Sequence, residues 1–210
     1  QSKTGIGNTM SPGDVGSLME DPSTAFRVDF EGRRPSNRFL YWRGLTLAAF
    51  DGRTWSEQAP GLDPNTGTLP LPRFTASSAP PVSYSISMEP SDQTYLLALD
   101  YLVSSAPKGT RQLYDGRLVS QQPIRRLMRL EGLTSDPMAT FDAQPMPALE
   151  RQRYTALPAG FNPKTVAMGQ AWKAQGLSPQ QIIDKALALY RKEFSYSLRP
   201  PLLGRHSVDE

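Results

Sequence analysis

Apolar and polar side chains alternate along much of the first half of the chain. The clearest case is residues 82–89, in which every second position is apolar and the positions between are serines. Residues 25–30 alternate in the same way. Because successive side chains of a strand point to opposite faces, this period of two predicts strands with one buried and one wet face. The predicted buried faces comprise Val82, Tyr84, Ile86 and Met88 in the first segment and Phe26, Val28 and Phe30 in the second.

Further short strands are expected where aromatic and branched residues cluster between turn signals. Asp51-Gly52 and Asp115-Gly116 are pairs that tight hairpins favour, because such turns need positive backbone angles. The expected strands are residues 38–43, 45–50, 95–99, 111–114, 117–120 and 124–131. Short strands at spacings of about ten residues are typical of a sandwich or small barrel. Residues 25–156 are therefore predicted to form a β-rich module of this kind.

The pattern becomes helical after residue 157. Asn162-Pro163 predicts a helix start, with asparagine as the N-cap and proline in the first turn, and Gly176 predicts its end. Ser178 and Gln181 have the spacing of a capping box around Pro179. The second helix has an apolar stripe that must pack against another part of the protein: Ile182, Ile183, Ala186, Leu187, Tyr190 and Phe194.

Together these patterns predict an α+β fold in three parts. Residues 1–24 lack apolar periodicity and are predicted to be a lead-in linker, followed by the β-rich module 25–156 and the helical part 157–210. Two helices cannot close a core alone, so the helical part is expected to be incomplete. The chain begins with Gln1 and no initiator methionine, and we interpret it as a piece of a longer protein.

The composition excludes several kinds of catalytic and metal site within this chain. The chain has no cysteine and one histidine, His206, which excludes disulfides, thiolate metal sites and a cysteine nucleophile within it and leaves no pair of histidines for a zinc site. The net charge of +3 comes without a polybasic tract, so nucleic acid is not an expected partner. Apolar runs are too short to cross a bilayer, and the proline-rich residues 58–81 predict a long surface loop.

Local motifs do not add a catalytic group. Ser105-Ala106-Pro107-Lys108 has the letters of a Ser-x-x-Lys pair, but Pro107 predicts a loop rather than the helix that this chemistry needs. Residues 63–67 lack the later ligands of a calcium loop and fit an Asx-turn. Arg125, Arg126 and Arg129 are predicted to form the solvent face of a strand. We therefore name no catalytic residue, cofactor or metal ligand in this chain.

Several blocks of sequence occur in a recognisable order and spacing. They are Met10-Ser11-Pro12-Gly13-Asp14, Ala25-Phe26-Arg27-Val28, Tyr41-Trp42-Arg43-Gly44, Phe50-Asp51-Gly52-Arg53-Thr54-Trp55, Leu157-Pro158-Ala159 with Asn162-Pro163, and the run from Phe194 through Pro200-Pro201-Leu202-Leu203-Gly204 to Val208-Asp209-Glu210. In this combination the chain resembles the periplasmic part of the bacterial transglutaminase-like membrane proteins of the TgpA type. The resemblance covers nearly the whole chain.

The resemblance implies a cysteine acyltransferase whose nucleophile, with a histidine and an aspartate, follows Glu210. Residues 157–210 would then be the start of a papain-like transglutaminase core, with the helix 179–194 behind the nucleophile helix. Tyr196 and His206 would either line the cleft or have structural roles, and His206 does not match the family's catalytic histidine. The fragment alone is expected to be inactive.

The resemblance also implies the setting and the partners of the protein. It places the chain on the periplasmic side of the inner membrane, with the membrane spans outside this chain. The expected partners are the remaining catalytic part of the same protein and a protein or peptide substrate with glutamine and amine groups.

Two other functions remain open at this point. The chain could be a non-catalytic β-sandwich binding or scaffold module for a periplasmic partner or cell-wall component, using the loop 58–81. It could also be a serine hydrolase with His206 as its base, although it has no Gly-x-Ser-x-Gly motif.

Overall fold

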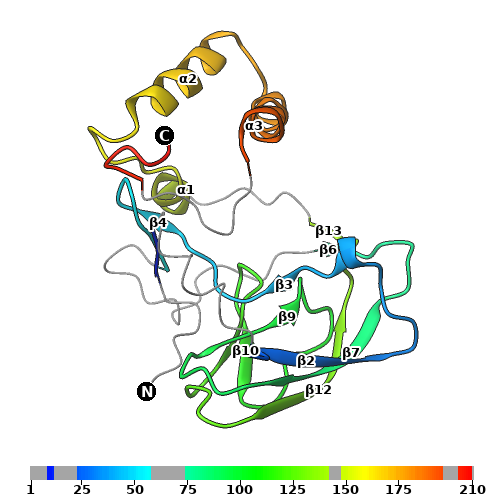
Figure 1. Ribbon diagram of the computed structural model, residues 1–210. Helices are drawn as coiled ribbons and strands as arrows, with labels where there is room; N and C mark the ends of the chain where they lie inside the picture. Colours follow the sequence, from blue (N-terminus) through cyan, green and yellow to red (C-terminus); the bar gives the residue numbers. More distant parts are fainter. Residues whose placement is uncertain (1–8, 12–22, 58–73, 142–147, 196–202, 210) are drawn as a thin grey trace.

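The chain folds into a β-rich body with three helices beside it, as the computed structural model in Figure 1 shows. The structure describes residues 9–11, 23–57, 74–141, 148–195 and 203–209. Strands account for most of the elements up to Phe141, and the helices follow them. The predicted α+β class, with the β-rich part first, is confirmed.

The central sheet has the order β12-β7-β2 and is antiparallel throughout. It contains β2 (Phe26–Glu31), β7 (Val82–Met88) and β12 (Met128–Ser135). Ile86 of β7 lies opposite Val28 on one side and Leu130 on the other, so the apolar positions of all three strands share a face. The two strands predicted most clearly from alternation are therefore confirmed.

Arg129 covers the other face of this sheet. Its guanidinium donates to the hydroxyls of Ser85 and Ser87 at 3.2 and 3.3 Å and forms ion pairs with Asp29 and Glu131. The aliphatic part of an arginine can shield a strand while its charged end stays in water. This explains why Ser85, predicted to lie on a wet face, is only 9% exposed.

The core lies between the central sheet and a set of shorter strands. These are β3 (Trp42–Arg43), β8 (Tyr95–Leu96), β9 (Ala98–Leu99), β10 (Thr110–Gln112) and β11 (Leu118–Ser120), which form the sheets β3-β9 and β10-β11-β8. Leu96, Leu99 and Leu118 are fully buried against Ile86. The fully buried Tyr84 satisfies its hydroxyl with the backbone N–H of Leu99 at 2.8 Å, which joins the central sheet to the second layer.

Three predicted strands differ from those observed. Residues 37–39 form a 3-10 turn, because the N–H groups of Phe39 and Leu40 bond back to residues 36 and 37, and only Trp42–Arg43 extends. Of residues 45–50, only Ala49–Phe50 is a strand, β4. The strand predicted at 124–131 begins at Met128, since Ile124 exchanges hydrogen bonds with the loop 91–93 instead.

Two segments predicted to lack strands contain short ones. Thr9–Met10 (β1) lies in the predicted linker 1–24 but pairs with Trp55–Ser56 (β5), which also pairs with β4. Phe74–Thr75 (β6) lies in the predicted loop 58–81 and pairs with Thr140–Phe141 (β13). Two-residue pairings carry too little alternation to stand out in a sequence. Residues 58–73 of that loop lie outside the described residues.

The three helices are α1 (Ala148–Tyr154), α2 (Pro163–Ala174) and α3 (Pro179–Glu193). The sequence patterns missed α1, although residues 148–153 are good helix formers; its Tyr154 hydroxyl bonds to that of Tyr114 in the β-rich body. The capping box at Ser178 is confirmed in full. Within the described residues, each helix is too short or too polar to cross a bilayer.

Candidate functional site at the hairpin junction

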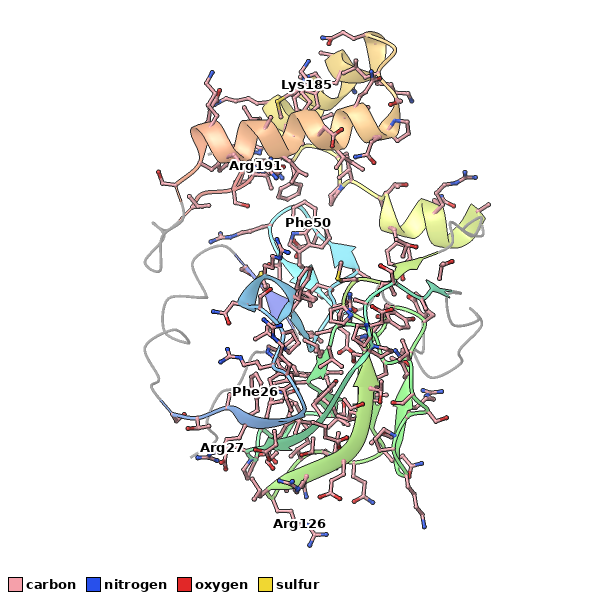
Figure 2. All side chains as sticks on the ribbon, turned by 90° about the vertical axis from the view of Figure 1, so that its right-hand side faces the viewer. Phe26, Arg27, Phe50, Arg126, Lys185 and Arg191 are labelled. Carbon is pink, nitrogen blue, oxygen red and sulfur yellow. The ribbon has the colours of Figure 1, made fainter. Side chains whose placement is uncertain are left out.

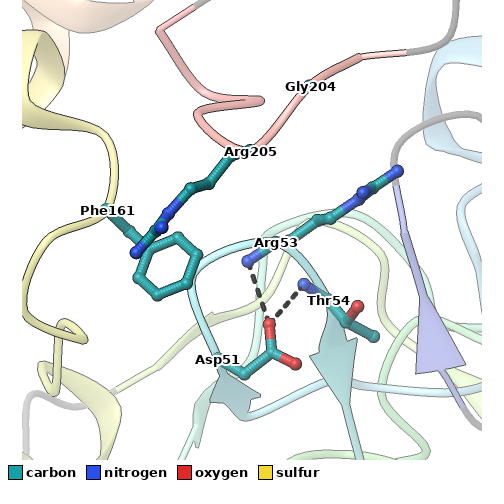
Figure 3. A pocket seen from close by; sticks show the side chains of 6 residues that line it. All are labelled: Asp51, Arg53, Thr54, Phe161, Gly204 and Arg205. Atoms are coloured by element: carbon teal, nitrogen blue, oxygen red, sulfur yellow. Dashed lines mark hydrogen bonds between the residues drawn. The ribbon is translucent and has the colours of Figure 1, made fainter.

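Three segments that are distant in the sequence meet at one place beside the helices. They are the loop 51–54 of the β4–β5 hairpin, residues 161–165 at the start of α2, and residues 203–209 near the end of the chain (Figures 1 and 3). The β-rich body and the helical part are joined here through side chains as well as through the covalent chain. This junction is the candidate functional site.

The hairpin loop is held in shape by Asp51. One carboxylate oxygen accepts the backbone N–H groups of Arg53 at 2.9 Å and Thr54 at 2.7 Å, as Figure 3 shows. These hydrogen bonds, that of Thr54 first, lower the pKa of the Asp51 carboxyl. The turn at Asp51-Gly52 is confirmed, but only Gly52 takes a positive angle, with φ of +106°.

Gly52 has no room for a side chain. A Cβ built on it would lie 2.3 Å from the ring of Phe161, which stands immediately before α2. The Arg205 guanidinium lies over the same ring, 4.9 Å from its centroid, a cation–π distance. One aromatic ring thus touches the other two segments of the junction.

Asn162 occupies the centre of the junction and is 5% exposed. Its Nδ2 donates to the carbonyl of Gly52 at 3.0 Å, and its Oδ1 accepts the backbone N–H of Val208 at 3.0 Å. Its own backbone N–H donates to Nδ1 of His206 at 2.9 Å. Asn162 is the N-cap of α2 and Pro163 follows it, as predicted. Its side chain makes no capping hydrogen bond, however, because the residue adopts a left-handed conformation (φ 49°) and directs its amide elsewhere.

Asp209 caps α2 in its place. Its carboxylate accepts the backbone N–H groups of Lys164 at 2.9 Å and Thr165 at 2.8 Å, together with the Thr165 hydroxyl. A carboxylate at a helix N-terminus satisfies free N–H groups and interacts well with the helix dipole. Desolvation raises the pKa of the Asp209 carboxyl, but these hydrogen bonds outweigh it and the pKa lies below its usual range.

A hollow of about 450 Å³ opens between these segments. It is lined by Asp51, Arg53, Thr54, Phe161, Gly204 and Arg205 (Figure 3). The two arginine side chains extend in different directions from it, so they do not form a clamp for one anion. No group of three metal-ligating side chains occurs among the described residues.

His206 lies at the junction and faces Asn162. Its Nδ1 accepts a hydrogen bond, whereas a triad histidine donates from Nδ1 to a carboxylate. The hydrogen bonding of His206 therefore does not match that of a triad histidine, which the serine hydrolase hypothesis requires. Tyr196, the other candidate cleft residue, lies outside the described residues, as does the segment 63–67.

The remaining motif residues lie elsewhere. Ser105 and Lys108 are exposed and lie in a loop, as predicted. Arg125 and Arg126 are also exposed but precede β12 instead of lying on it, and only Arg129 is a strand residue. Phe161 and Asp209 carry no local signal in the sequence as junction residues. Asp209 lies 45 positions beyond Lys164, whose N–H it accepts, and no sequence pattern links residues so far apart as helix and cap.

The exposed apolar face of α3 is a second feature of the helical part. Four large side chains along it are between 44% and 59% exposed: Ile183, Leu187, Tyr190 and Phe194. Tyr190 and Phe194 contact one another edge-to-face with centroids 5.2 Å apart. About half of the surface of these four side chains therefore lies in solvent within the described part of the chain. Figure 2 shows α3, which carries the labelled Lys185 and Arg191, at one end of the molecule.

Comparisons with known proteins agree with one another. The profile of the TgpA N-terminal domain matches residues 1–138. A protein-glutamine gamma-glutamyltransferase of Pseudomonas aeruginosa is 34% identical over 208 residues, which are 99% of this chain and 30% of that protein. The chain thus spans less than a third of the length of this curated relative.

Two solved structures share the fold. The periplasmic domain of TgpA from Pseudomonas aeruginosa matches with a TM-score of 0.85 and 33% identity, covering 98% of this chain and 69% of that one. The same domain bound to ethylmercury matches with a TM-score of 0.83 and 32% identity, covering 98% and 70%. At this identity and coverage the likeness extends to both the β-rich body and the helices.

Proposed function

Because the chain belongs to the TgpA N-terminal domain family, we propose that it is the N-terminal part of the periplasmic region of a transglutaminase-like acyltransferase held at the inner membrane. The observation that carries this proposal is the fold match over 98% of the chain to a TgpA periplasmic domain that is longer than this chain. A non-catalytic scaffold module, the alternative, is not favoured by these matches.

The exposed face of α3 supports the same proposal. The apolar stripe of a helix in a soluble domain normally packs against a core. Within the described residues no core covers this stripe fully, because three of its side chains are about half exposed: Ile183, Leu187 and Tyr190. The additional part of the catalytic domain would supply the missing surface. In this proposal α3 belongs to the start of the transglutaminase core, and the proposed division at residue 157 separates it from the β-rich module.

The proposed reaction is acyl transfer from glutamine. A cysteine thiolate beyond Glu210 attacks the side-chain carboxamide carbon, the C–N bond breaks, and the nitrogen leaves as ammonia after taking a proton from a histidine. A primary amine then attacks the thioester, gives a proton to the same histidine, forms the new amide bond and releases the thiolate. This chain supplies none of these reacting groups; its role is to support them. The proposed substrate is a protein or peptide with glutamine and amine groups.

Amine incorporation tests the proposal directly. The protein extended beyond Glu210 through its catalytic domain is incubated with a benzyloxycarbonyl-Gln-Gly dipeptide and monodansylcadaverine, and the fluorescent product is measured. We expect product from the extended protein, and none from the 210-residue chain or from a variant whose proposed nucleophilic cysteine is alanine. Equal product from the cysteine variant would contradict a thioester mechanism, and a reading frame without that cysteine would contradict the proposal as a whole.

A further inference from the structure

Asn162 adopts a left-handed conformation, with φ of 49° and ψ of 54°. Most residues other than glycine avoid this region because of the cost in backbone energy, and asparagine is one of the few that tolerate it. Both ends of its amide are used in hydrogen bonds. Strained backbone held by a full set of contacts occurs preferentially where a precise local geometry matters.

The two amide bonds of Asn162 join different parts of the protein. Nδ2 holds the hairpin loop through the Gly52 carbonyl, and Oδ1 holds residues 203–209 through the N–H of Val208. His206 adds a third contact from the same segment to the backbone of Asn162. The side chain of Asn162 thereby links the backbone of Val208 to the β-rich body.

We propose that Asn162 is a positioning residue for acyl transfer: it fixes residues 203–209, the segment that precedes the catalytic part, relative to the β-rich body. This inference rests on the proposed function, in which the chain continues from this segment toward the nucleophile. A displacement of about 1 Å in a reacting group can reduce a rate roughly 100-fold. The side chain does not touch the substrate. It acts on the chemical step by fixing the backbone that leads to the reacting groups.

Two variants separate the contributions of the side chain. Asn162→Gly keeps the left-handed backbone, which glycine adopts readily, and keeps the N–H that His206 accepts. It removes both amide bonds. Asn162→Asp keeps an oxygen for the Val208 N–H but places the other oxygen against the Gly52 carbonyl. Ser104→Ala is the matched control, because it removes one hydrogen bond, to the Thr134 N–H, within the β-rich body.

The measurements are kinetics and hydrogen exchange on the protein extended through its catalytic domain. For Asn162→Gly we expect kcat per thiol titrated with iodoacetamide to fall at least 10-fold, with KM for the glutamine dipeptide within twofold. Loss of two hydrogen bonds should lower the exchange protection of Val208 by roughly 5- to 100-fold. Asn162→Asp should restore part of kcat, and Ser104→Ala should change neither quantity.

Three results would contradict a positioning role for Asn162 or the proposed function on which it rests. An unchanged kcat per titrated thiol in Asn162→Gly would overturn the proposal, because a purely stabilising residue alters the titrated fraction and not its rate. An equal loss in Ser104→Ala would overturn it as well. If the parent protein transfers no acyl group, the proposed function fails, and unchanged protection of Val208 in Asn162→Gly would then exclude the positioning contact on its own.

Discussion

The close approach of Gly52 to Phe161 leads to a quantitative prediction for Gly52→Ala. The substitution adds a single methyl group at φ of +106°, where it would lie 2.3, 2.5 and 2.7 Å from three carbons of the Phe161 ring. Two penalties follow, one from the backbone angle and one from the overlap. Movement of the Phe161 ring would disturb two other contacts. The Arg205 guanidinium lies over the ring, and the next residue, Asn162, is hydrogen-bonded to the Gly52 carbonyl.

A second glycine separates the two penalties. Gly32 has φ of +90° but no atom within 4 Å of its built Cβ, so Gly32→Ala carries the backbone penalty alone. A strained angle costs about 1–3 kcal/mol. Overpacking typically adds about 1–3 kcal/mol. We therefore expect the loss in free energy of unfolding for Gly52→Ala to exceed that for Gly32→Ala by about 1–3 kcal/mol.

The assay is urea unfolding of this chain followed by tryptophan fluorescence, with hydrogen exchange at residues 161–165 as a local measure. In a Phe161→Ala background the ring is absent, so the cost of Gly52→Ala should fall to that of Gly32→Ala. Equal costs for the two glycine substitutions in the parent chain would refute the reasoning. So would an unchanged cost of Gly52→Ala after removal of the ring, since the two sites would then be independent.

Three further predictions concern the core, the charges and α3. Leu118→Ala should cost about 2–5 kcal/mol of unfolding free energy in urea, because Leu118 is fully buried, and a loss below about 1 kcal/mol would mean that the core collapses around it. Burial raises the pKa of the Asp136 carboxyl, but hydrogen bonds from Ser77, Met138 and Ala139 outweigh it and lower the pKa. Its stabilisation is therefore present above the unfolded pKa and lost as pH falls through the lower folded value, so Asp136→Asn should flatten the stability profile below about pH 4, and an unchanged acid limb would contradict this. Leu187→Ala should change the stability of this chain by less than about 1 kcal/mol, but that of the protein extended through its catalytic domain by about 2–4 kcal/mol if α3 is covered there; equal small effects in both would argue against a covered face.

The sequence predicts those parts of the fold in which one segment carries its own signal. Alternation over six or seven residues located β2 and β7, since each position on the apolar face packs against the same core. The capping box of α3 is equally local, because Ser178 and Gln181 bond to each other. Strands of two residues, such as β1 and β6, exist only because a distant partner supplies the ladder.

The junction shows why a site made from distant segments escapes sequence reasoning. Asn162 before a proline fits the pattern of a helix cap, and its neighbours give no reason to expect otherwise. Its amide instead finds Gly52, 110 positions earlier, and Val208, 46 positions later. The predicted start of α2 is confirmed, but the group that accepts its free N–H groups is the carboxylate of Asp209 rather than the side chain of Asn162.

The distance along the chain between α2 and its cap also affects how the helix forms during synthesis. The carboxylate that closes the first turn of the helix is 45 positions downstream of Lys164, so it emerges from the ribosome after the start of the helix does. At about 5–20 residues per second, roughly 2–9 s of synthesis separate the two. During that interval the N–H groups of Lys164 and Thr165 have only water or the Asn162 side chain available. Until Asp209 emerges, the first turn of α2 therefore lacks the carboxylate cap that it has in the folded chain.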